Sequence, residues 1–481
     1  MMSREKEVFV KAILTELEDD NLAIFAGAGL SAGAGFVDWK TLLEPLAEDL
    51  SLDISKVTDL VALAQYHCNE NCDNRSKIND IILNKFSQKK DTTPTHSVLS
   101  SLPISTYWTT NYDKLIELAL AERGKCVDVK HTNEHLTLTK RGRDAVVYKM
   151  HGDVDHPNNA ILTKDDYEQY HLKMEHYLSA LKGDLISKTF IFIGFSFTDP
   201  NLDYILSRVR VAYEKNQRQH YCFVRSVKEY ECNSNADYEY NMRKQELFIN
   251  DLKRFGIKAI KVEEYFEITE LLREIESRYK RKTVFISGAA HEYNDWSEED
   301  ALFFLNNLSS DLIKKNFKIV SGFGLGVGSS IISGALEEIY LRGASHSAEQ
   351  LILRPFPYQE VKSDNLKQCY TQYRSDMISH AGIAVFLFGN KKLKDGTLAM
   401  SDGMSEEFEI CLQHGIPIIL VGATGYITKE LLEEYLDKEE LPNDFKNYLI
   451  QLDKVSDIKE LNELLLEAIQ HTCKMERLKY A

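Results

Sequence analysis

Short apolar runs alternate with helical stretches along the whole chain, and this alternation predicts α/β layers built on parallel strands. Each run ends in small or polar residues, and open parallel sheets place their ligands at such strand ends. Helices are expected between the runs, for example over residues 39–50 and 201–217. In the first half, six runs are expected to be strands: NLAIFAG, STYWTTN, AVVYKMHGD, TFIFIGFS, HYCFVR and IKAIKV.

A second series of strands is expected after the basic helical stretch LLREIESRYKRK. We place a domain boundary near Lys282, which gives domains of residues 1–282 and 283–481. No Pro- or Ser-rich tether separates them, which indicates closely docked domains. The predicted fold class is therefore α/β, with two Rossmann-like parallel-sheet domains. The second series comprises TVFISG, FKIVSG, LILRPF, GIAVFLFGN and IPIILVG.

The composition excludes several classes of protein. A chain of 481 residues is too long for one ordinary hydrophobic core. Its net charge of −16 repels nucleic acid and anionic lipid at long range, so neither is an expected partner. The eight cysteines form no CxxC pair, so no metal site is expected. The charged N-terminal stretch lacks the apolar core of a signal peptide, and we expect a cytoplasmic protein.

The stretch FAGAGLSAGAGF, from Phe25 to Phe36, crowds glycine into one turn after the first strand. Its spacing of Gly27, Gly29 and Gly33 differs from the GxGxxG dinucleotide fingerprint by one residue. Glycine lets a backbone approach a ligand closely, and a helix beginning beyond the turn directs free N–H groups at a diphosphate. The alternative is a tight turn that binds nothing.

Three further strand ends of the first half carry residues suited to chemistry. They are Asn111 and Asp113 in WTTNYD, His151 in KMHGD, and Gly194, Ser196 and Asp199 in FIGFSFTDP. A lone histidine is more often structural than catalytic. Here a histidine, an asparagine and a glycine loop are all expected at the same edge of one sheet.

In this order and spacing, GAGLS, TTNYD, HG and GFS resemble the motifs of the sirtuin (SIR2) family, over roughly residues 10–280. Sirtuins cleave the nicotinamide–ribose bond of NAD. The resemblance implies NAD as the substrate, His151 as the catalytic base, and Asn111 beside the nicotinamide and its ribose. It also implies an NAD-binding set: Gly27, Ala28, Gly29 and Ser31 along the diphosphate and ribose, Asp113 supporting the nicotinamide pocket, and Gly194 and Ser196 over the adenosine side.

The residue types suit that chemistry. A carboxamide such as Asn111 holds a ribose hydroxyl or a water without being charged. A neutral imidazole at His151 takes a proton from it, since the unperturbed pKa of histidine, about 6.5, lies near working pH. Protein-deacylating sirtuins carry a four-cysteine zinc module and a loop for the acyl-lysine peptide, and neither is found here. This difference favours NAD hydrolysis over deacylation, while ADP-ribosyl transfer and cyclisation stay open.

A second glycine-rich turn, SGFGLGVGSS, follows a strand of the second half and leads into an apolar-periodic helix. Alternate glycines suit a phosphate or a close backbone approach, and a glycine-rich packing turn is the alternative. Taken singly, the charged residues of this half are ordinary surface residues. The candidate binding residues are Gly288, Gly324, Gly326, Arg374, Asn390, Lys391 and Glu407.

Together these features resemble the SLOG family of nucleotide-sensing and nucleotide-processing domains. DGMSEEFE keeps Gly403 and Glu407 but lacks the paired glycines and threonine of the PGGxGTxxE loop of the cytokinin enzymes. The resemblance therefore implies ligand binding rather than hydrolysis in this domain. Arg374 is expected to clamp a phosphate, Lys391 to add positive charge, and Glu407 to accept hydrogen bonds from ribose hydroxyls.

A SIR2-like domain followed by a SLOG-like domain resembles the effectors of the bacterial Thoeris anti-phage system. This resemblance implies a partner protein with a TIR domain that makes a cyclic ADP-ribose isomer. This isomer is expected to bind the SLOG-like domain and to activate NAD cleavage by the SIR2-like domain. It also implies a homo-oligomer, a tetramer or a filament. Two alternatives stay open: a non-catalytic NAD or ADP-ribose sensor, and a zinc-free deacylase or ADP-ribosyltransferase.

Overall fold

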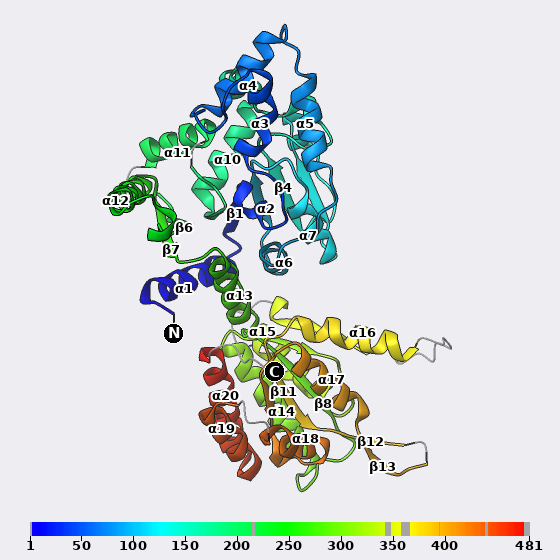
Figure 1. Cartoon of the computed structure of the whole chain (residues 1–481). Coiled ribbons are helices and arrows are strands. Elements are labelled where there is room, and N and C mark those ends of the chain that lie inside the picture. Colours follow the sequence, from blue (N-terminus) through cyan, green and yellow to red (C-terminus); the bar gives the residue numbers. More distant parts are fainter. Residues whose placement is uncertain are drawn as a thin grey trace. The chain divides into compact units, whose positions relative to one another are not determined.

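The computed structural model describes residues 2–197, 199–213, 217–341, 348–356, 366–393, 395–437 and 441–475. The chain forms two compact units, Met1–Glu276 and Ser277–Ala481, and each unit has its own parallel sheet (Figure 1). The division falls within helix α13 (Phe266–Lys280), shortly before the boundary expected near Lys282. The prediction of two parallel-sheet α/β domains is confirmed.

The sheet of the first unit has seven strands in the order β3-β4-β2-β1-β5-β6-β7, and every neighbouring pair is parallel. The strands are β1 (Leu22–Ala26), β2 (Thr106–Thr109), β3 (Val127–Lys130), β4 (Ala145–Lys149), β5 (Thr189–Ile193), β6 (His220–Arg225) and β7 (Ile257–Val262). Besides α13, the helices are α1 (Arg4–Glu18), α2 (Ala28–Ala32), α3 (Trp39–Asp49), α4 (Leu60–Glu70), α5 (Ser76–Phe86), α6 (Pro94–Ser101), α7 (Leu115–Glu122), α8 (Asn133–Thr137), α9 (Lys164–Lys173), α10 (Glu175–Ser187), α11 (Pro200–Tyr213) and α12 (Asn235–Leu252).

β1 lies at the centre of this sheet, between β2 and β5. All five of its residues are buried, as expected for a strand covered on both faces. Aromatic side chains fill much of the core beside it: Phe25 and Phe192 have ring centroids 5.3 Å apart, and Trp108 stacks on Tyr148 at 4.2 Å. The chain runs from β1 to one side of the sheet and returns with β5 on the other. The carboxyl ends of β1 and β5 therefore form a topological switch point, where open α/β sheets bind ligands.

The sheet of the second unit has five parallel strands in the order β10-β9-β8-β11-β14, so its switch point lies at β8 and β11. The strands are β8 (Thr283–Ala289), β9 (Lys318–Ser321), β10 (Leu351–Leu353), β11 (Ile383–Phe388) and β14 (Ile418–Leu420), and the short strands β12 (Asn390–Lys392) and β13 (Leu398–Met400) form an antiparallel pair. The helices are α14 (Glu298–Lys314), α15 (Gly328–Leu341), α16 (Leu366–Ser379), α17 (Asp402–Gln413), α18 (Tyr426–Leu436), α19 (Asn443–Lys454) and α20 (Ile458–Lys474).

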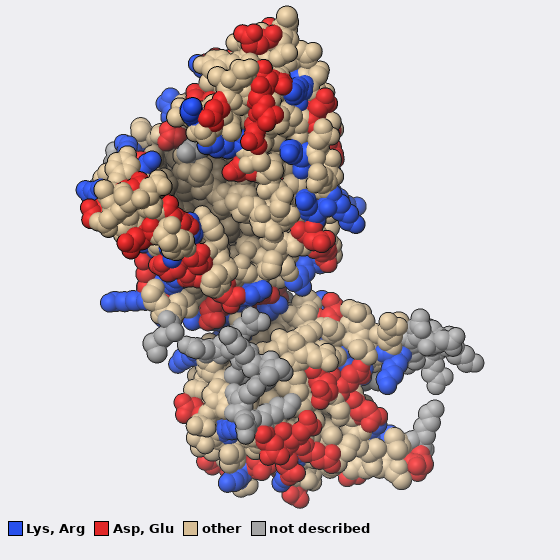
Figure 2. Space-filling model, viewed as in Figure 1, with Lys and Arg blue, Asp and Glu red and all other residues tan. Residues whose placement is uncertain are grey.

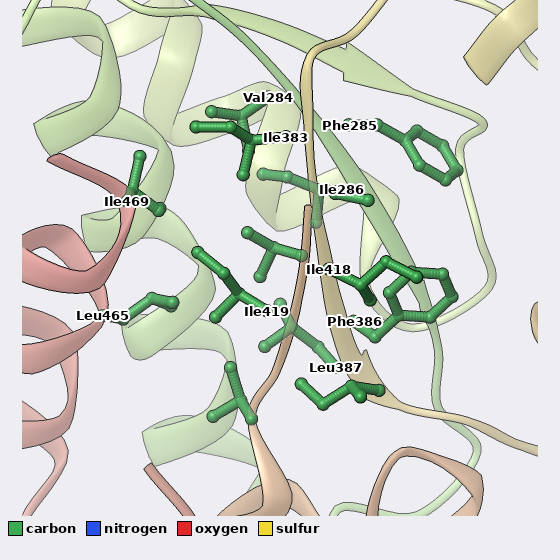
Figure 3. Packing of buried hydrophobic residues seen from close by; sticks show 14 of the residues in the cluster. Val284, Phe285, Ile286, Ile383, Phe386, Leu387, Ile418, Ile419, Leu465 and Ile469 are labelled. Carbon is green, nitrogen blue, oxygen red and sulfur yellow. The ribbon is translucent and has the colours of Figure 1, made fainter. Parts of the chain in front are cut away.

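The core of the second unit is aliphatic where α20 covers the sheet. Leu465 and Ile469 of α20 and Ile419 of β14 belong to one buried cluster, with Ile286 of β8 and Ile383 of β11 (Figure 3). Of these side chains only Ile286 shows any exposed surface, at 3%. Among the helices that the structure describes, none combines the length and the apolar composition that crossing a bilayer requires.

Eleven strands were expected from the apolar runs, and each contains an observed strand. Three observed strands, β3, β12 and β13, were not predicted. The buried positions of β3 are Asp128 and Lys130, whose charged groups pair at 2.9 Å, so hydrophobic patterning does not reveal this strand. The predicted helix over residues 201–217 is observed as α11, and residues 214–216 lie outside the described part of the chain.

Candidate functional site

The first glycine turn packs backbone against backbone at the switch point of the first sheet. A Cβ atom on Gly27 would lie 2.4 Å from Gly194 O, and one on Gly194 would lie 2.2 Å from Leu30 N. Gly194 also has a φ of +65°, in the left-handed region that favours glycine. The Gly27 N–H donates to Ile193 O at 2.9 Å. The Gly29 N–H donates to Gly194 O at 2.9 Å. These two donors are therefore used within the protein.

Asn111 follows β2 and joins its loop to the glycine turn. Its Nδ2 atom donates to Gly27 O at 3.0 Å and to Ser31 Oγ at 3.1 Å. Its backbone N–H donates to Thr109 Oγ1 at 3.0 Å, and the residue is 8% exposed. A carboxamide has two N–H donors, so both are engaged here and a ligand would be held by the oxygen Oδ1.

His151 lies just beyond the carboxyl end of β4, buried beside a carboxylate. Its Nε2 atom is 2.9 Å from Asp199 Oδ2, and the two side chains are 2% and 7% exposed. Tyr167 donates its hydroxyl to the same Asp199 oxygen at 3.2 Å. The rings of Trp39 and Tyr167 have centroids 6.1 and 5.6 Å from that of the imidazole. His151 therefore lies in a largely aromatic setting with one nearby negative charge.

Lys149, at the end of β4, is fully buried and links the loops that follow β2 and β4. Its Nζ atom donates to Asp153 Oδ2 at 2.6 Å and lies 3.1 Å from Glu117 Oε1. It also donates to the backbone oxygens of Tyr112 at 3.1 Å and Asp113 at 2.6 Å. One ammonium group thus holds the Asn111 loop against the His151 loop.

Lys149 and the carboxylates around it shift one another's pKa values. Burial alone would lower the pKa of Lys149, but Glu117 and Asp153 raise it above its ordinary value. Burial raises the pKa of Glu117, although Lys149 opposes that shift. Asp113 belongs to this structural region, since it is 4% exposed and its Oδ1 accepts the Leu115 N–H at the start of α7.

A cavity of about 1020 Å³ opens at these strand ends, and Figure 2 shows the surface of the first unit hollowed beside α11. This volume matches the upper range of ligand pockets, about 1,000 Å³, and leaves room for a dinucleotide. Of the residues expected from the sequence, Ser31, Asn111 and Asp113 do not line it: Asn111 is hydrogen-bonded to Ser31 and to the wall residue Gly27, and Asp113 lies beside Lys149. Those that do line it are Gly27, Ala28, Gly29, His151, Gly194 and Ser196.

Sequence reasoning missed much of the cavity wall. The helices α3, α4 and α9 all begin at the cavity, with Asp38 and Asp59 as N-caps of α3 and α4 and Lys164 as the first residue of α9. An N-capping aspartate before a helical pattern is a signal for a helix start, but it does not indicate which helix starts converge. Asp199, which the sequence placed at a strand end without a role, also lines the wall. The wall residues not predicted are Asp38, Trp39, Lys40, Thr58, Asp59, Leu60, Val61, Thr110, Lys164, Tyr167, Glu168 and Phe195.

The second glycine turn also presses against a strand end. A Cβ atom on Gly324 would lie 1.9 Å from Gly288 O, and one on Gly326 would lie 2.0 Å from Ala290 O. Gly326 has a φ of +71°. The Ala290 N–H donates to Leu325 O at 2.8 Å, which fastens the turn to the end of β8. Gly288, Gly324 and Gly326 therefore lie close together.

Arg374 of α16 forms a charged cluster with α17. Its Nη1 is 2.6 Å from Glu406 Oε2, and its Nε is 3.6 Å from Glu407 Oε1. The guanidinium carbon lies 4.6 Å from the ring centroid of Phe356. Ser287, on β8, donates to Glu407 Oε2 at 2.6 Å. Burial raises the pKa of Glu407 to about 7, although Ser287 and Arg374 oppose the shift.

Asn390 and Lys391 have hydrogen-bond partners other than those of Arg374. Asn390 is 1% exposed, and its Oδ1 accepts the backbone N–H groups of His291 at 2.8 Å and Glu292 at 3.0 Å. It thereby holds the loop that follows β8. Lys391 Nζ donates to Asp402 Oδ2 at 2.6 Å, and Asp402 is the first residue of α17.

The eight cysteines are all free thiols, and Cys68, Cys222 and Cys411 are buried. Burial raises the pKa of the Cys222 thiol to about 12, so this side chain is held in its neutral form. In the part of the chain that the structure describes, no group of three or more His, Cys, Asp or Glu residues is arranged to hold a metal ion.

Comparison with known families assigns both halves of the chain. The family described as "SIR2-like domain" matches residues 105–246, and the "Sir2- and TIR-associating SLOG family" matches residues 267–475. The first match contains Asn111, His151 and Asp199, and the second contains Arg374 and Glu407.

Several curated relatives match nearly the whole chain. The NAD(+) hydrolase ThsA of Bacillus cereus (strain MSX-D12) is 54% identical over 425 residues, which cover 88% of each chain. The protein of the same name from Acinetobacter baumannii (strain 532279) is 47% identical over 453 residues, covering 93% of this chain and 92% of the relative. A more distant relative, the defense-associated sirtuin 2 of Bacillus subtilis, is 26% identical over 208 residues, covering 42% of this chain and 20% of that protein.

Proposed function

This chain belongs to the ThsA family of NAD(+) hydrolases, and we propose that it hydrolyses NAD to nicotinamide and ADP-ribose in the cavity of its first unit. The observation that carries the proposal is the position of His151. Its imidazole lines a cavity of about 1020 Å³ together with Gly27 and Gly29, and Asn111 is hydrogen-bonded to Gly27. A base, a carboxamide and a glycine turn thus meet at one switch point.

The geometry suggests a division of labour. NAD carries a positively charged pyridinium ring, so the glycosidic bond breaks with its electron pair going to the ring nitrogen, and nicotinamide leaves as a neutral molecule. Asn111 Oδ1 accepts a hydrogen bond from a ribose hydroxyl or from the attacking water. His151 takes the proton from that hydroxyl or water, and the oxygen of the water bonds to the sugar carbon.

The wall of the cavity suits an anionic dinucleotide. The N-termini of α3, α4 and α9 carry partial positive charge toward it, and Lys40 and Lys164 add full positive charges. Aromatic surface beside His151 is provided by Trp39. These features bring positive charge and aromatic surface together on the wall of one cavity.

The test is nicotinamide release from NAD by the purified full-length protein, with and without cyclic ADP-ribose isomers. We expect release of nicotinamide and ADP-ribose in equal amounts. Asn111→Ala and His151→Ala should each lower the rate by at least about 100-fold. Release that persists in either variant would refute its role. Binding of NAD without cleavage would indicate a sensor, and cleavage that requires an acylated peptide would indicate a deacylase.

We further propose that the second unit binds the signal that switches the first unit on. In this proposal a TIR-domain partner makes a cyclic ADP-ribose isomer, and its phosphates contact Arg374 and Lys391. Glu407 would accept from ribose hydroxyls, while Gly288, Gly324, Gly326 and Asn390 shape the binding loops. The matching family is described as associating with Sir2 and TIR, which supports this assignment.

Gating of this kind has a definite energetic requirement. An unregulated NAD hydrolase would kill its own cell, so the resting protein must be inactive. Shifting a population from about 1% to about 99% active needs about 5.5 kcal/mol of differential binding. Several subunits that switch together share that requirement, which is why we propose a homotetramer or filament that acts in the cytoplasm and depletes NAD during phage infection.

A further inference from the structure

We propose that Asp199 is a positioning residue for His151: its carboxylate orients the imidazole and stabilises the charged form that arises when His151 accepts a proton. This inference rests on the proposed hydrolysis of NAD at the same site. Asp199 stands immediately before α11, whereas His151 follows β4, so only the fold brings them together.

The contact is short and shielded from solvent. Asp199 Oδ2 is 2.9 Å from His151 Nε2, with the side chains 7% and 2% exposed. The ring N–H is not aligned for an ideal hydrogen bond, so the contact is mainly electrostatic in this conformation. A charge pair is far stronger in such a setting than at the surface, because little water screens it.

The two oxygens of Asp199 have separate partners. Oδ1 accepts the Leu202 N–H at 2.9 Å, and the backbone oxygen of Asp199 accepts the Asp203 N–H at 3.0 Å, so the residue caps α11. Oδ2 faces His151 and also receives the Tyr167 hydroxyl at 3.2 Å. The helix fixes the carboxylate in place, and the oxygen not used for the cap is directed at the imidazole.

The carboxylate of Asp199 is ionised when His151 accepts the proton. Burial alone would raise the pKa of Asp199, but His151, the Leu202 N–H and the Tyr167 hydroxyl together lower it below its ordinary value. Asp199 therefore keeps its charge while the proton moves from the ribose hydroxyl or water to His151, and it takes up no proton itself. The imidazolium then releases that proton to solvent.

Other groups also face this region and would contribute to its pH dependence. Tyr167 and Trp39 pack on the imidazole. Burial raises the pKa of Tyr167, so its hydroxyl stays protonated. The further charged groups on the cavity wall are Asp38, Lys40, Asp59, Lys164 and Glu168. Among these neighbours, only Asp199 lies within ion-pair distance of the imidazole in the described part of the chain.

The decisive variant is Asp199→Asn, because asparagine retains an N-cap for α11 but removes the charge. We expect kcat for nicotinamide release to fall about 100-fold with KM for NAD nearly unchanged. The pH profile of kcat should also change, since a negative charge beside the proposed base is removed. Tyr167→Phe should lower kcat less. Asp457→Asn, which alters the N-cap of α20 in the other unit, is the matched control and should behave as wild type.

A double variant separates action through His151 from a structural effect. If Asp199 acts through the imidazole, Asp199→Asn causes no further loss in a His151→Ala background. Additive losses, or an Asp199→Asn enzyme with unchanged kcat and pH profile, would overturn the inference while leaving the proposed hydrolysis intact. A wild-type protein that releases no nicotinamide under any condition would instead overturn the proposed function itself.

Discussion

Both units contain a glycine turn packed closely against neighbouring backbone, and they differ in the side chains beside that turn. In each, a glycine turn that follows a strand, β1 in the first unit and β9 in the second, presses against the end of a neighbouring strand so tightly that no Cβ atom fits at Gly27 or Gly324. Beside the first turn lies a cavity of about 1020 Å³ with a buried histidine on its wall. Near the second, charged side chains pair across α16 and α17, with Arg374 between Glu406 and Glu407.

This difference separates the requirements of catalysis from those of recognition. In the proposed role of a base, His151 must be shielded from solvent, and its buried setting provides this. In the proposed role of a phosphate-binding residue, Arg374 has to exchange one anionic partner for another, and it already contacts two carboxylates. A glycine turn therefore marks a place where a ligand can lie, and the neighbouring side chains determine what happens to it.

The largest effect on stability is expected from replacing a glycine by alanine where two backbone segments are in close contact. Gly194→Ala and Gly324→Ala would each place Cβ within about 2 Å of backbone atoms, at 2.2 Å and 1.9 Å. Each should lower the free energy of unfolding of its own unit by about 4 kcal/mol or more, or prevent folding. Scanning calorimetry of the two variants measures this loss.

Gly124→Ala is the matched control for strain alone. Gly124 has a φ of +73°, but nothing lies within 4 Å of its Cβ position, so the change should cost only about 1–2 kcal/mol. Equal losses in Gly124→Ala and Gly194→Ala would show that conformation, and not close packing, explains the first turn.

Removing the buried cation of the first unit should have the next largest effect. Lys149→Met leaves Asp153 and Glu117 without their counter-ion and should cost about 3–5 kcal/mol in urea unfolding. Adding Asp153→Asn should recover part of that loss. Lys114→Met, which removes a partly exposed partner of Asp155, should cost no more than about 1 kcal/mol. A loss as small as that in Lys149→Met would contradict the role assigned to the buried cation.

The second unit should show a pH dependence that arises from Glu407. Its pKa is about 7 in the folded chain against 4.5 for an unperturbed glutamate, so the folded state holds this proton more strongly. Its contribution to stability therefore falls as pH rises from about 4.5 to about 7, by up to roughly 3 kcal/mol. Glu407→Gln should remove this slope from urea midpoints measured across that range.

Glu409→Gln, an exposed position on the same helix, should leave the slope unchanged.

In the first unit, His220 should give the opposite slope. Burial lowers its pKa to about 4, so its contribution to stability is lost as pH falls from about 6.5 toward 4. Finding the same direction for both residues would contradict the contrast between the units.

The smallest effect on stability is expected at Arg374. Arg374→Gln removes a mostly buried but incompletely enclosed cation and should cost about 1 kcal/mol. The response to cyclic ADP-ribose isomers should nevertheless disappear, as measured by nicotinamide release. Lys429→Gln, on α18 of the same unit, should retain the full response. A normal response in Arg374→Gln would remove this residue from the proposed signal site.

The sequence was informative wherever a residue type has one dominant environment. Apolar runs become buried strands whatever surrounds them, so the two sheets were predictable. His151 and the glycine turns were recognisable from their place at strand ends. By contrast, a lysine is nearly always exposed, and nothing in YKMHGD shows that Lys149 is fully buried. The contact of Asp199 with His151 depends on where α11 begins relative to β4, which no local pattern encodes.

The order of strands in the first sheet has a consequence for synthesis of the protein. β1 is made early, but its neighbour β5 is made only after β2, β3 and β4, so β1 has an unpaired edge until then. The partner of His151, Asp199, emerges from the ribosome later still. A nascent chain that has not reached Asp199 therefore lacks a finished pocket and the activity proposed for it. The same delay leaves an apolar strand edge open to wrong pairing until β5 has been made.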